Sequence, residues 1–227
     1  AISNEETRYF LNGLYFNVTN DNDRNIVTLV GTDGHRLAKF SHQIDDEINQ
    51  VSGVIIPKKT IYELSKLLSE INIDVNISIS SNKIVFIIGD IVFISKLIDG
   101  SFPDYNRVIP KDNTNTLKIN RDKLLSAVDR VSTIANEKSP VIKFKFLKNI
   151  LNLNTINNES STASEDLIIN YEGDEIEIGF NSKYIMDIVN NLEDSEISIN
   201  LKDNTSPVIA KENSNTNLIY VLMPMRV

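Results

Sequence analysis

The sequence predicts an α+β fold in which antiparallel sheets predominate and two similar units follow one another along the chain. Three observations predict it. Short strand-like runs make up most of the periodic sequence, helical spacing occurs in only three segments, and one pattern of strand, helix and strand recurs. The chain is therefore expected to be rich in sheet.

The predicted strands are short runs with alternating or continuous apolar character. They lie at 25–30, 75–79, 83–88, 91–97, 116–119, 141–153, 176–180 and 197–201, and residues 220–222 are expected to form a last core strand.

Three segments carry apolar residues at the spacing of an amphipathic helix: Pro57–Glu70, Asn120–Ala135 and Asn181–Leu192. Pro57 suits a first helical turn, and Asn120 and Asn181 are of a type that caps helix N-termini. The stripes expected to face a core are Ile61, Leu64, Leu68 and Ile71 in the first helix, Leu124, Val128, Val131 and Ala135 in the second, and Tyr184, Ile185, Ile188 and Leu192 in the third.

An internal repeat organises the chain. Residues 56–64 recur in pattern as 180–188, an offset of 124, and the strand pairs 75–79 with 197–201 and 93–97 with 220–224 match at similar offsets. The polar stretch 112–116 is the expected linker, so domains are predicted at 1–111 and 117–227. The second unit opens with a strand and a helix for which the first has no room before Arg8. The first unit is therefore expected to be incomplete at its start and to belong to a longer protein.

Composition excludes several classes of function. The 227 residues contain no cysteine, which removes disulfides, thiolate metal sites and cysteine nucleophiles and suits a reducing, cytoplasmic location. The 23 basic and 31 acidic side chains leave a net charge of -8, which argues against gripping nucleic acid by bulk attraction. No phosphate-binding loop, dinucleotide fingerprint, signal peptide or apolar run of membrane-spanning length is seen, so no cofactor and no membrane association are expected.

One cluster has the residue types of a catalytic or metal site, Thr32-Asp33-Gly34-His35-Arg36-Leu37. A carboxylate and an imidazole two residues apart are compatible with acid–base or metal chemistry, and a metal-dependent hydrolase using Asp33 and His35 is one hypothesis. The other interpretation is a tight turn at Gly34 after a strand, with Asp33 and His35 satisfying backbone groups. Residues alone leave both open.

The C-terminus is apolar to its last residues, whereas chain ends are usually polar. Pro224 would interrupt a strand ladder. Two methionines beside that proline suit a surface groove that accepts apolar ligands.

Five sequence blocks, at 8–13, 32–38, 96–105, 135–138 and 223–226, closely resemble the bacterial sliding clamp family, the beta subunit of DNA polymerase III, and follow its order. The resemblance covers the second and third of three clamp domains. It implies the DNA clamp fold, a head-to-tail dimeric ring of six domains around duplex DNA with helices inside and sheets outside, and a processivity factor with no catalytic centre.

The resemblance also implies DNA contacts that are weak and independent of base sequence, because a ring holds DNA topologically. On the helices, Lys58, Tyr62 and Lys66 share one face, and Arg121, Lys123 and Arg130 decorate the second. The residues assigned to DNA are Arg8, Tyr9, Phe10, Lys58, Lys59, Lys66, Arg121 and Lys123.

A second implied site is a groove between the two domains for extended peptides of the polymerase III alpha subunit, the clamp loader and repair polymerases. The matching positions are Leu11, Thr32, Gly34, His35, Arg36, Leu37, Pro103, Arg107 and Val108 from the second domain, and Tyr184, Thr205, Pro207, Val221, Leu222, Met223, Pro224, Met225 and Arg226 from the third.

Thr133 and Ile134 match the homodimer contact of the third domain. The stretch 157–166 departs from a strand pattern, so its part in that interface is left open. A further hypothesis is an adaptor that resembles a clamp and never encircles DNA.

Overall fold

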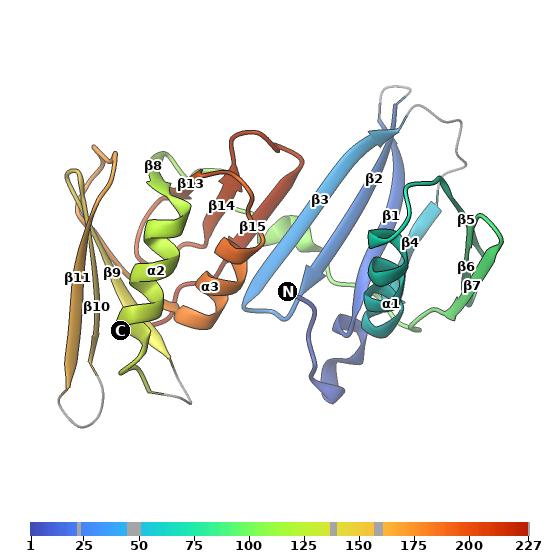
Figure 1. Ribbon diagram of the computed structural model, residues 1–227, viewed down its shortest axis with the longest axis horizontal. Coiled ribbons are helices and arrows are strands. Elements are labelled where there is room, and N and C mark those ends of the chain that lie inside the picture. Colours follow the sequence, from blue (N-terminus) through green and yellow to red (C-terminus); the bar gives the residue numbers. More distant parts are fainter. Residues whose placement is uncertain (22–23, 45–50, 137–139, 157–160, 227) are drawn as a thin grey trace. The chain divides into compact units, whose positions relative to one another are not determined.

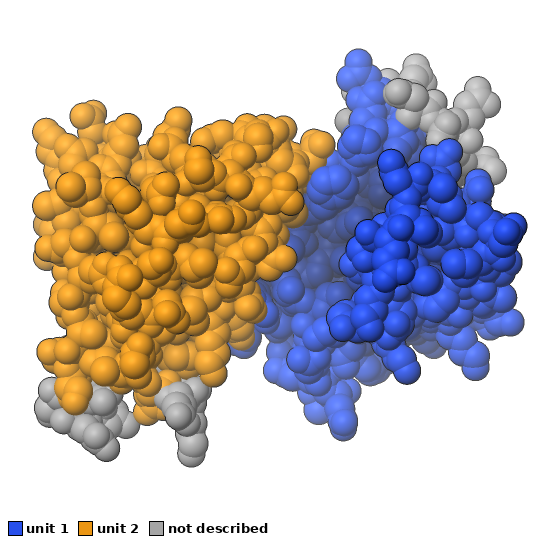
Figure 2. All heavy atoms as spheres, viewed as in Figure 1, with its two compact units in different colours: residues 1–104 blue, residues 105–227 orange. Residues whose placement is uncertain are grey.

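The computed structural model describes all residues except 22–23, 45–50, 137–139, 157–160 and 227. The chain forms two compact units, Ala1–Asp104 and Tyr105–Val227, which Figure 2 distinguishes by colour. This division lies before the predicted linker at 112–116, and the last two linker residues already belong to the first strand of unit 2. Residues 105–111 therefore fall in unit 2 and not, as predicted, in the first domain.

Unit 1 contains two antiparallel sheets and one α-helix (Figure 1). The first sheet has the order β4-β1-β2-β3 and the second has the order β5-β6-β7. Phe16 and Val18 of the first sheet meet Ile84, Phe86 and Ile88 of the second in the core. The elements are η1 (Glu6–Leu11), β1 (Gly13–Asp21), β2 (Arg24–Thr32), β3 (Arg36–Ile44), β4 (Val51–Pro57), α1 (Lys58–Ser69), β5 (Val75–Ile79), β6 (Lys83–Ile88) and β7 (Ile91–Lys96).

Unit 2 contains two antiparallel sheets and two α-helices (Figure 1). Its sheets have the orders β11-β10-β9-β12 and β15-β14-β13-β8. The elements are η2 (Tyr105–Arg107), β8 (Asn115–Asn120), α2 (Arg121–Ser132), β9 (Val141–Leu147), β10 (Ile150–Ile156), β11 (Thr162–Ile168), β12 (Ile176–Asn181), α3 (Ser182–Asn190), β13 (Glu196–Leu201), β14 (Val208–Glu212) and β15 (Leu218–Leu222).

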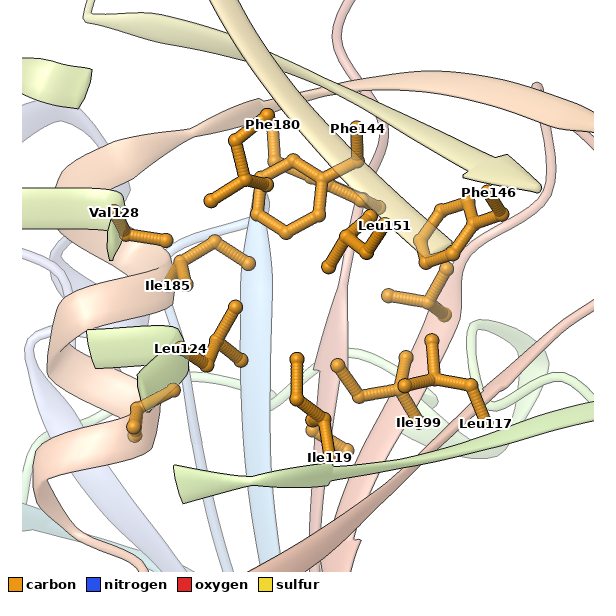
Figure 3. Packing of buried hydrophobic residues seen from close by; sticks show 14 of the residues in the cluster. Leu117, Ile119, Leu124, Val128, Phe144, Phe146, Leu151, Phe180, Ile185 and Ile199 are labelled. Carbon is orange, nitrogen blue, oxygen red and sulfur yellow. The ribbon is translucent and has the colours of Figure 1, made fainter. Parts of the chain in front are cut away.

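The core of unit 2 is shared by both sheets and both helices (Figure 3). Leu124 of α2 and Ile185 of α3 pack with Phe144 of β9, Phe180 of β12 and Ile199 of β13. The Phe144 and Phe180 rings meet edge to face, with centroids 5.2 Å apart. The predicted stripes of α2 and α3 thus lie on the buried faces of these helices, with Tyr184 half-buried. Ala135 and Leu192 lie beyond the ends of α2 and α3, and Leu192 is nevertheless buried.

The helix starts follow the sequence. The Asn120 side chain accepts a hydrogen bond from the Lys123 backbone N–H at 3.0 Å, and the Asn181 side chain accepts one from the Lys183 N–H at 3.0 Å. Pro57 stands at the N-cap of α1, one position before the first turn where it was predicted, and makes no side-chain cap.

The internal repeat is confirmed in three dimensions. β1 to β4, α1 and β5 to β7 follow the same order as β9 to β12, α3 and β13 to β15. Isolated bridges also correspond: Ile55 pairs with Ile98 in unit 1, and Gly179 with Met225 in unit 2. In the described residues of unit 1, no element matches β8 or α2.

Two strand predictions were wrong. The run 141–153 is a hairpin of β9 and β10, because Asn149 adopts a φ of 60° and reverses the chain. Part of the stretch 157–166 belongs to β11, which begins at Thr162 and pairs with β10 along its length. Residues 157–160 of that stretch lie outside the described residues.

Candidate functional site

The segment Thr32–Arg36 is a hairpin turn between β2 and β3. Gly34 adopts a φ of +88°, a conformation that side chains with a Cβ rarely take. Asp33 Oδ1 accepts from the backbone N–H groups of His35 at 2.9 Å and Arg36 at 3.0 Å, and Asp33 Oδ2 accepts from Arg36 Nε at 3.1 Å. The Thr32 hydroxyl donates to the Arg36 carbonyl at 2.7 Å.

These bonds favour the structural interpretation of the cluster. Both carboxylate oxygens of Asp33 are occupied by the turn, as that interpretation predicts for Asp33. Among the described residues, no group of three or more His, Cys, Asp or Glu side chains is placed to hold a metal ion. His35 is exposed beside the turn, and Leu37, the next inward residue, is buried.

The cations of unit 1 lie on η1 and α1. Arg8 donates from Nε and Nη2 to the two carboxylate oxygens of Glu5, both at 2.7 Å, and this pairing raises the pKa of Arg8 and lowers that of Glu5. Tyr9 beside it is exposed and meets Phe10 edge to face.

On α1, Lys58 Nζ donates to Asn4 Oδ1 at 2.8 Å, and Lys66 Nζ lies 4.9 Å from the centre of the exposed Tyr62 ring. Lys59 is also exposed. The exposed face of α1 therefore presents lysines whose contacts in the structure are with uncharged groups.

The cations of α2 are arranged differently. Arg121 donates to the Leu192 carbonyl at 2.6 Å and, through Nε and Nη2, to Asp122. Arg130 is paired with Glu165. Lys123 is exposed. Arg121 thus ties the start of α2 to the chain that follows α3, and of the two α2 residues assigned to DNA only Lys123 has an exposed charge.

The end of the chain forms one side of a hollow within unit 2. The Met225 N–H donates to the Gly179 carbonyl at 2.8 Å and pins the segment to the edge of β12. The hollow has a volume of about 380 Å³, a size suited to a small ligand or a few peptide residues. Its walls are Glu177, Gly179, Asn204, Thr205, Pro224, Met225 and Arg226.

The loop with Asn204 and Thr205 is held by one carboxylate. Asp203 accepts hydrogen bonds from the N–H and hydroxyl of Thr205 and from the N–H and hydroxyl of Ser206. These bonds favour the ionised form and lower the pKa of Asp203 to about 2. The wall opposite the C-terminal segment is therefore preorganised.

The other residues assigned to the peptide groove have varied surroundings. Leu222 is buried in the core of unit 2, so its side chain is a packing residue and is unavailable to a ligand. Tyr184 packs half-buried against that core, and Pro207 and Met223 are also half-buried. Leu11 and Val221 are buried. Pro103 is exposed in unit 1, whereas Arg107 and Val108, predicted in the first domain, are exposed residues of unit 2.

Three residues that line the hollow were not predicted from the sequence: Glu177, Gly179 and Asn204. Glu177 alternates with buried residues along a strand, a pattern typical of ordinary surface positions. The internal repeat could have pointed to these residues, because it relates β12 to β4 and the C-terminal segment to the residues after β7.

At the predicted dimer contact, Thr133 is the C-cap of α2 and donates its hydroxyl to the Asp129 carbonyl at 3.2 Å. Thr133 is exposed and Ile134 is half-buried.

Two models of one protein family match the chain in succession. The central domain of the DNA polymerase III beta subunit matches residues 1–104, and its C-terminal domain matches residues 106–226. The chain belongs to the DNA polymerase III beta subunit family. This confirms the resemblance and the clamp fold class drawn from the five sequence blocks.

The named relatives of the chain are sliding clamps of the same family. The beta sliding clamp of Caulobacter vibrioides is 39% identical over the whole chain, and that of Escherichia coli K12 is 36% identical over 226 residues. A crystal structure of the Bartonella birtlesii sliding clamp bound to griselimycin superposes on the whole chain with a TM-score of 0.96 at 46% identity and is itself covered to 61%. For the Pseudomonas aeruginosa subunit the TM-score is 0.94 at 34% identity, with 61% of that chain covered.

The chain spans 61% of the Caulobacter relative and 60% of the Escherichia coli relative. In the part of the chain that the structure describes, no helix has the length and apolar character needed to cross a membrane.

Proposed function

We propose that this chain is the central and C-terminal part of a cytoplasmic sliding clamp, a non-catalytic factor that confers processivity on a replicative DNA polymerase by encircling duplex DNA. The observation that carries the proposal is the match of both family domains, in order, across the whole chain. The partners proposed are duplex DNA, the DNA polymerase III alpha subunit, the clamp loader and repair polymerases, with a homodimer in the full-length protein.

Contact with DNA is proposed for the cations of η1 and α1. Lys58, Lys59 and Lys66 lie on one helix and are exposed, which suits weak contacts to successive phosphates. The net charge of -8 does not oppose this role, because a ring needs local compensation of charge and no tight grip.

Peptide capture is proposed for the hollow of unit 2 and for the turn of unit 1. The hollow combines the apolar Met225 and Pro224 with polar groups on Thr205 and Arg226, a mixture that suits an extended segment with one large apolar side chain. In the turn, the fixed geometry of Thr32–Arg36 would present His35 and Arg36 without reorganisation.

The test uses a fluorescent peptide ending in Leu-Phe and measures its anisotropy as the chain is added. Met225→Ala together with Arg226→Ala removes one wall of the hollow, and we expect affinity to fall by about tenfold or more because hot-spot contacts are lost. Lys202→Ala is the control for loss of a cation, since Lys202 is exposed, precedes Asn204 by two residues and does not line the hollow. Absence of saturable binding by the unsubstituted chain, or equal loss in the control, would contradict peptide capture at this place.

A further inference from the structure

Unit 1 contains a hollow that is the counterpart, by the internal repeat, of the hollow in unit 2. It has a volume of about 440 Å³. Its walls come from β4, from the turn between β5 and β6, and from the residues after β7, including Gly53, Asn82, Ile98 and Asp99. In unit 2 the walls come from β12, from the connection between β13 and β14, and from the residues after β15. The two hollows therefore have the same construction.

One hydrogen bond marks the correspondence. The Ile98 N–H donates to the Ile55 carbonyl at 2.9 Å, as the Met225 N–H donates to the Gly179 carbonyl at 2.8 Å. The repeat offset of 124 places Ile55 at the position of Gly179, and the pairing of Phe93 with Tyr220 places Ile98 at the position of Met225. Both bonds fasten a chain segment to the outer edge of a strand that ends its sheet, β4 or β12.

The strand edge differs beside the hollow of unit 1. The pairing of β4 with β1 runs regularly from Pro57 to Val54, then shifts register so that Val51 pairs with Val18. Ser52 and Gly53 thus form a bulge next to the hollow. Bulges end regular pairing and redirect the chain, and they are frequent beside binding sites.

The charges of the two hollows also differ. At the position of Glu177, unit 1 has Gly53, and at the position of Arg226 it has Asp99, which is exposed. In unit 2 the Glu177 carboxylate is paired with Lys143 at 2.8 Å. The hollow of unit 1 therefore has one charged side chain in its walls, a carboxylate.

We infer that the hollow of unit 1 is a second peptide-binding site, and that it takes an extended segment with lysine or arginine next to an apolar residue. The apolar residue would rest against Val54, Leu97 and Ile98, and the cation would pair with Asp99. The inference rests on the geometry of unit 1 and extends beyond the proposed function, which uses the hollow of unit 2.

The test uses two labelled hexapeptides, one alternating leucine and lysine and one alternating leucine and glutamate, with the whole chain. An exposed ion pair contributes up to about fivefold in affinity, so we expect the lysine peptide to bind about fivefold more tightly than the glutamate peptide. Asp99→Asn should bring the two affinities within about twofold of each other.

Location is tested by filling each hollow in turn. Ser81→Trp on the exposed turn of unit 1 should abolish binding of the lysine peptide, while Asn204→Trp in the hollow of unit 2 should leave it unchanged. As a readout that needs no substitution, the amide resonances of Ile98 and Asp99 should shift on titration with the lysine peptide.

Equal affinity for both peptides, or unchanged binding in Ser81→Trp with unshifted amides at 98 and 99, would overturn the inference. Loss in Asn204→Trp alone would place the lysine peptide in unit 2 and would equally overturn it. Binding of the Leu-Phe peptide and its loss in the Met225 and Arg226 variant are measured separately, so failure of one proposal leaves the other standing.

Discussion

The two units share one order of strands and helix, yet they bury their cores to different degrees. In unit 2, residues such as Leu124, Phe144 and Leu151 are at most 1% exposed. In unit 1, the apolar face of α1 (Ile61, Leu64 and Leu68) stays half-buried. Among the described residues, six side chains make up the buried cluster of unit 1.

The difference follows from the covering helices. Unit 2 has α2 and α3 packed side by side, so that each helix covers part of the other's apolar stripe as well as the sheets (Figure 1). The described part of unit 1 has α1 alone. A repeated strand order is therefore not sufficient for equal burial, because the second helix supplies much of the apolar surface.

The largest expected effect is a loss of stability in unit 2, which has the more fully buried core. Phe144→Ala should lower the free energy of unfolding of unit 2 by about 3 to 5 kcal/mol, because it leaves a cavity among Phe146, Phe180 and Leu124. Leu64→Ala in unit 1 should cost less, about 1 to 2 kcal/mol, since part of this side chain is already in water.

Urea denaturation followed by near-ultraviolet circular dichroism measures both. A cost for Leu64→Ala equal to that for Phe144→Ala would show that the burial difference does not govern stability.

An intermediate effect is expected on the affinity for duplex DNA, where the lysines of α1 should matter more than lysines elsewhere in unit 1. Lys58→Ala together with Lys66→Ala should weaken duplex binding by about tenfold at low salt, and the logarithmic salt slope should fall by about 2, because two phosphate contacts are lost. Lys83→Ala with Lys96→Ala removes the same charge from β6 and β7 and should change the affinity by less than about twofold.

Anisotropy of a labelled duplex at several salt concentrations gives both numbers. Equal losses in the two double variants would mean that net charge, and not the face of α1, determines binding.

The smallest effect is a difference in acid response between the loops of the two hollows. The pKa of Asp203 is lowered to about 2, so the order that Asp203 gives its loop should be complete above the unfolded value of 3.8 and be lost as the pH falls through about 2. The corresponding turn in unit 1 closes through the Ser80 N–H to the Lys83 carbonyl at 2.9 Å and should not respond over this range.

Amide resonances of Thr205 and Ser206, with those of Ser80 and Lys83 as reference, follow the two loops during an acid titration. A midpoint near 3.8 at Thr205 would contradict the role given to the four hydrogen bonds.

The helices were accessible to sequence reasoning because each combines a stripe with a recognisable start. Leu124, Val128 and Val131 are buried as the spacing predicted, and Asn120 caps its helix. β1, β3, β4, β11 and β14 were missed. In β1, Phe16 and Val18 alternate with Asn17 and Thr19 as in an ordinary half-buried strand, and this signal was overlooked. In β11, Glu165 occupies a half-buried position and interrupts the apolar side of the strand.

The candidate site could be predicted from the sequence only in part. Thr205, Pro224, Met225 and Arg226 were assigned by resemblance, and the structure places these four around one hollow. Glu177 and Gly179 were missed because their position depends on which strand edge the chain end meets, and no local pattern encodes that. Leu222 was assigned to the groove by resemblance, and 220–222 were also expected to form a core strand; in the structure its side chain packs in the core of unit 2.

The pairing of Arg8 with Glu5 has a consequence for movement along a duplex. In the proposed contact with DNA, an incoming phosphate would displace the Glu5 carboxylate, which accepts two charge-assisted hydrogen bonds from Arg8. The net free energy of such an exchange is the small difference between two similar anions, so the contact would add little friction as one phosphate replaces the next. In the proposed DNA contact, the Glu5 counterion of Arg8 would therefore let the duplex move past without a deep energy minimum.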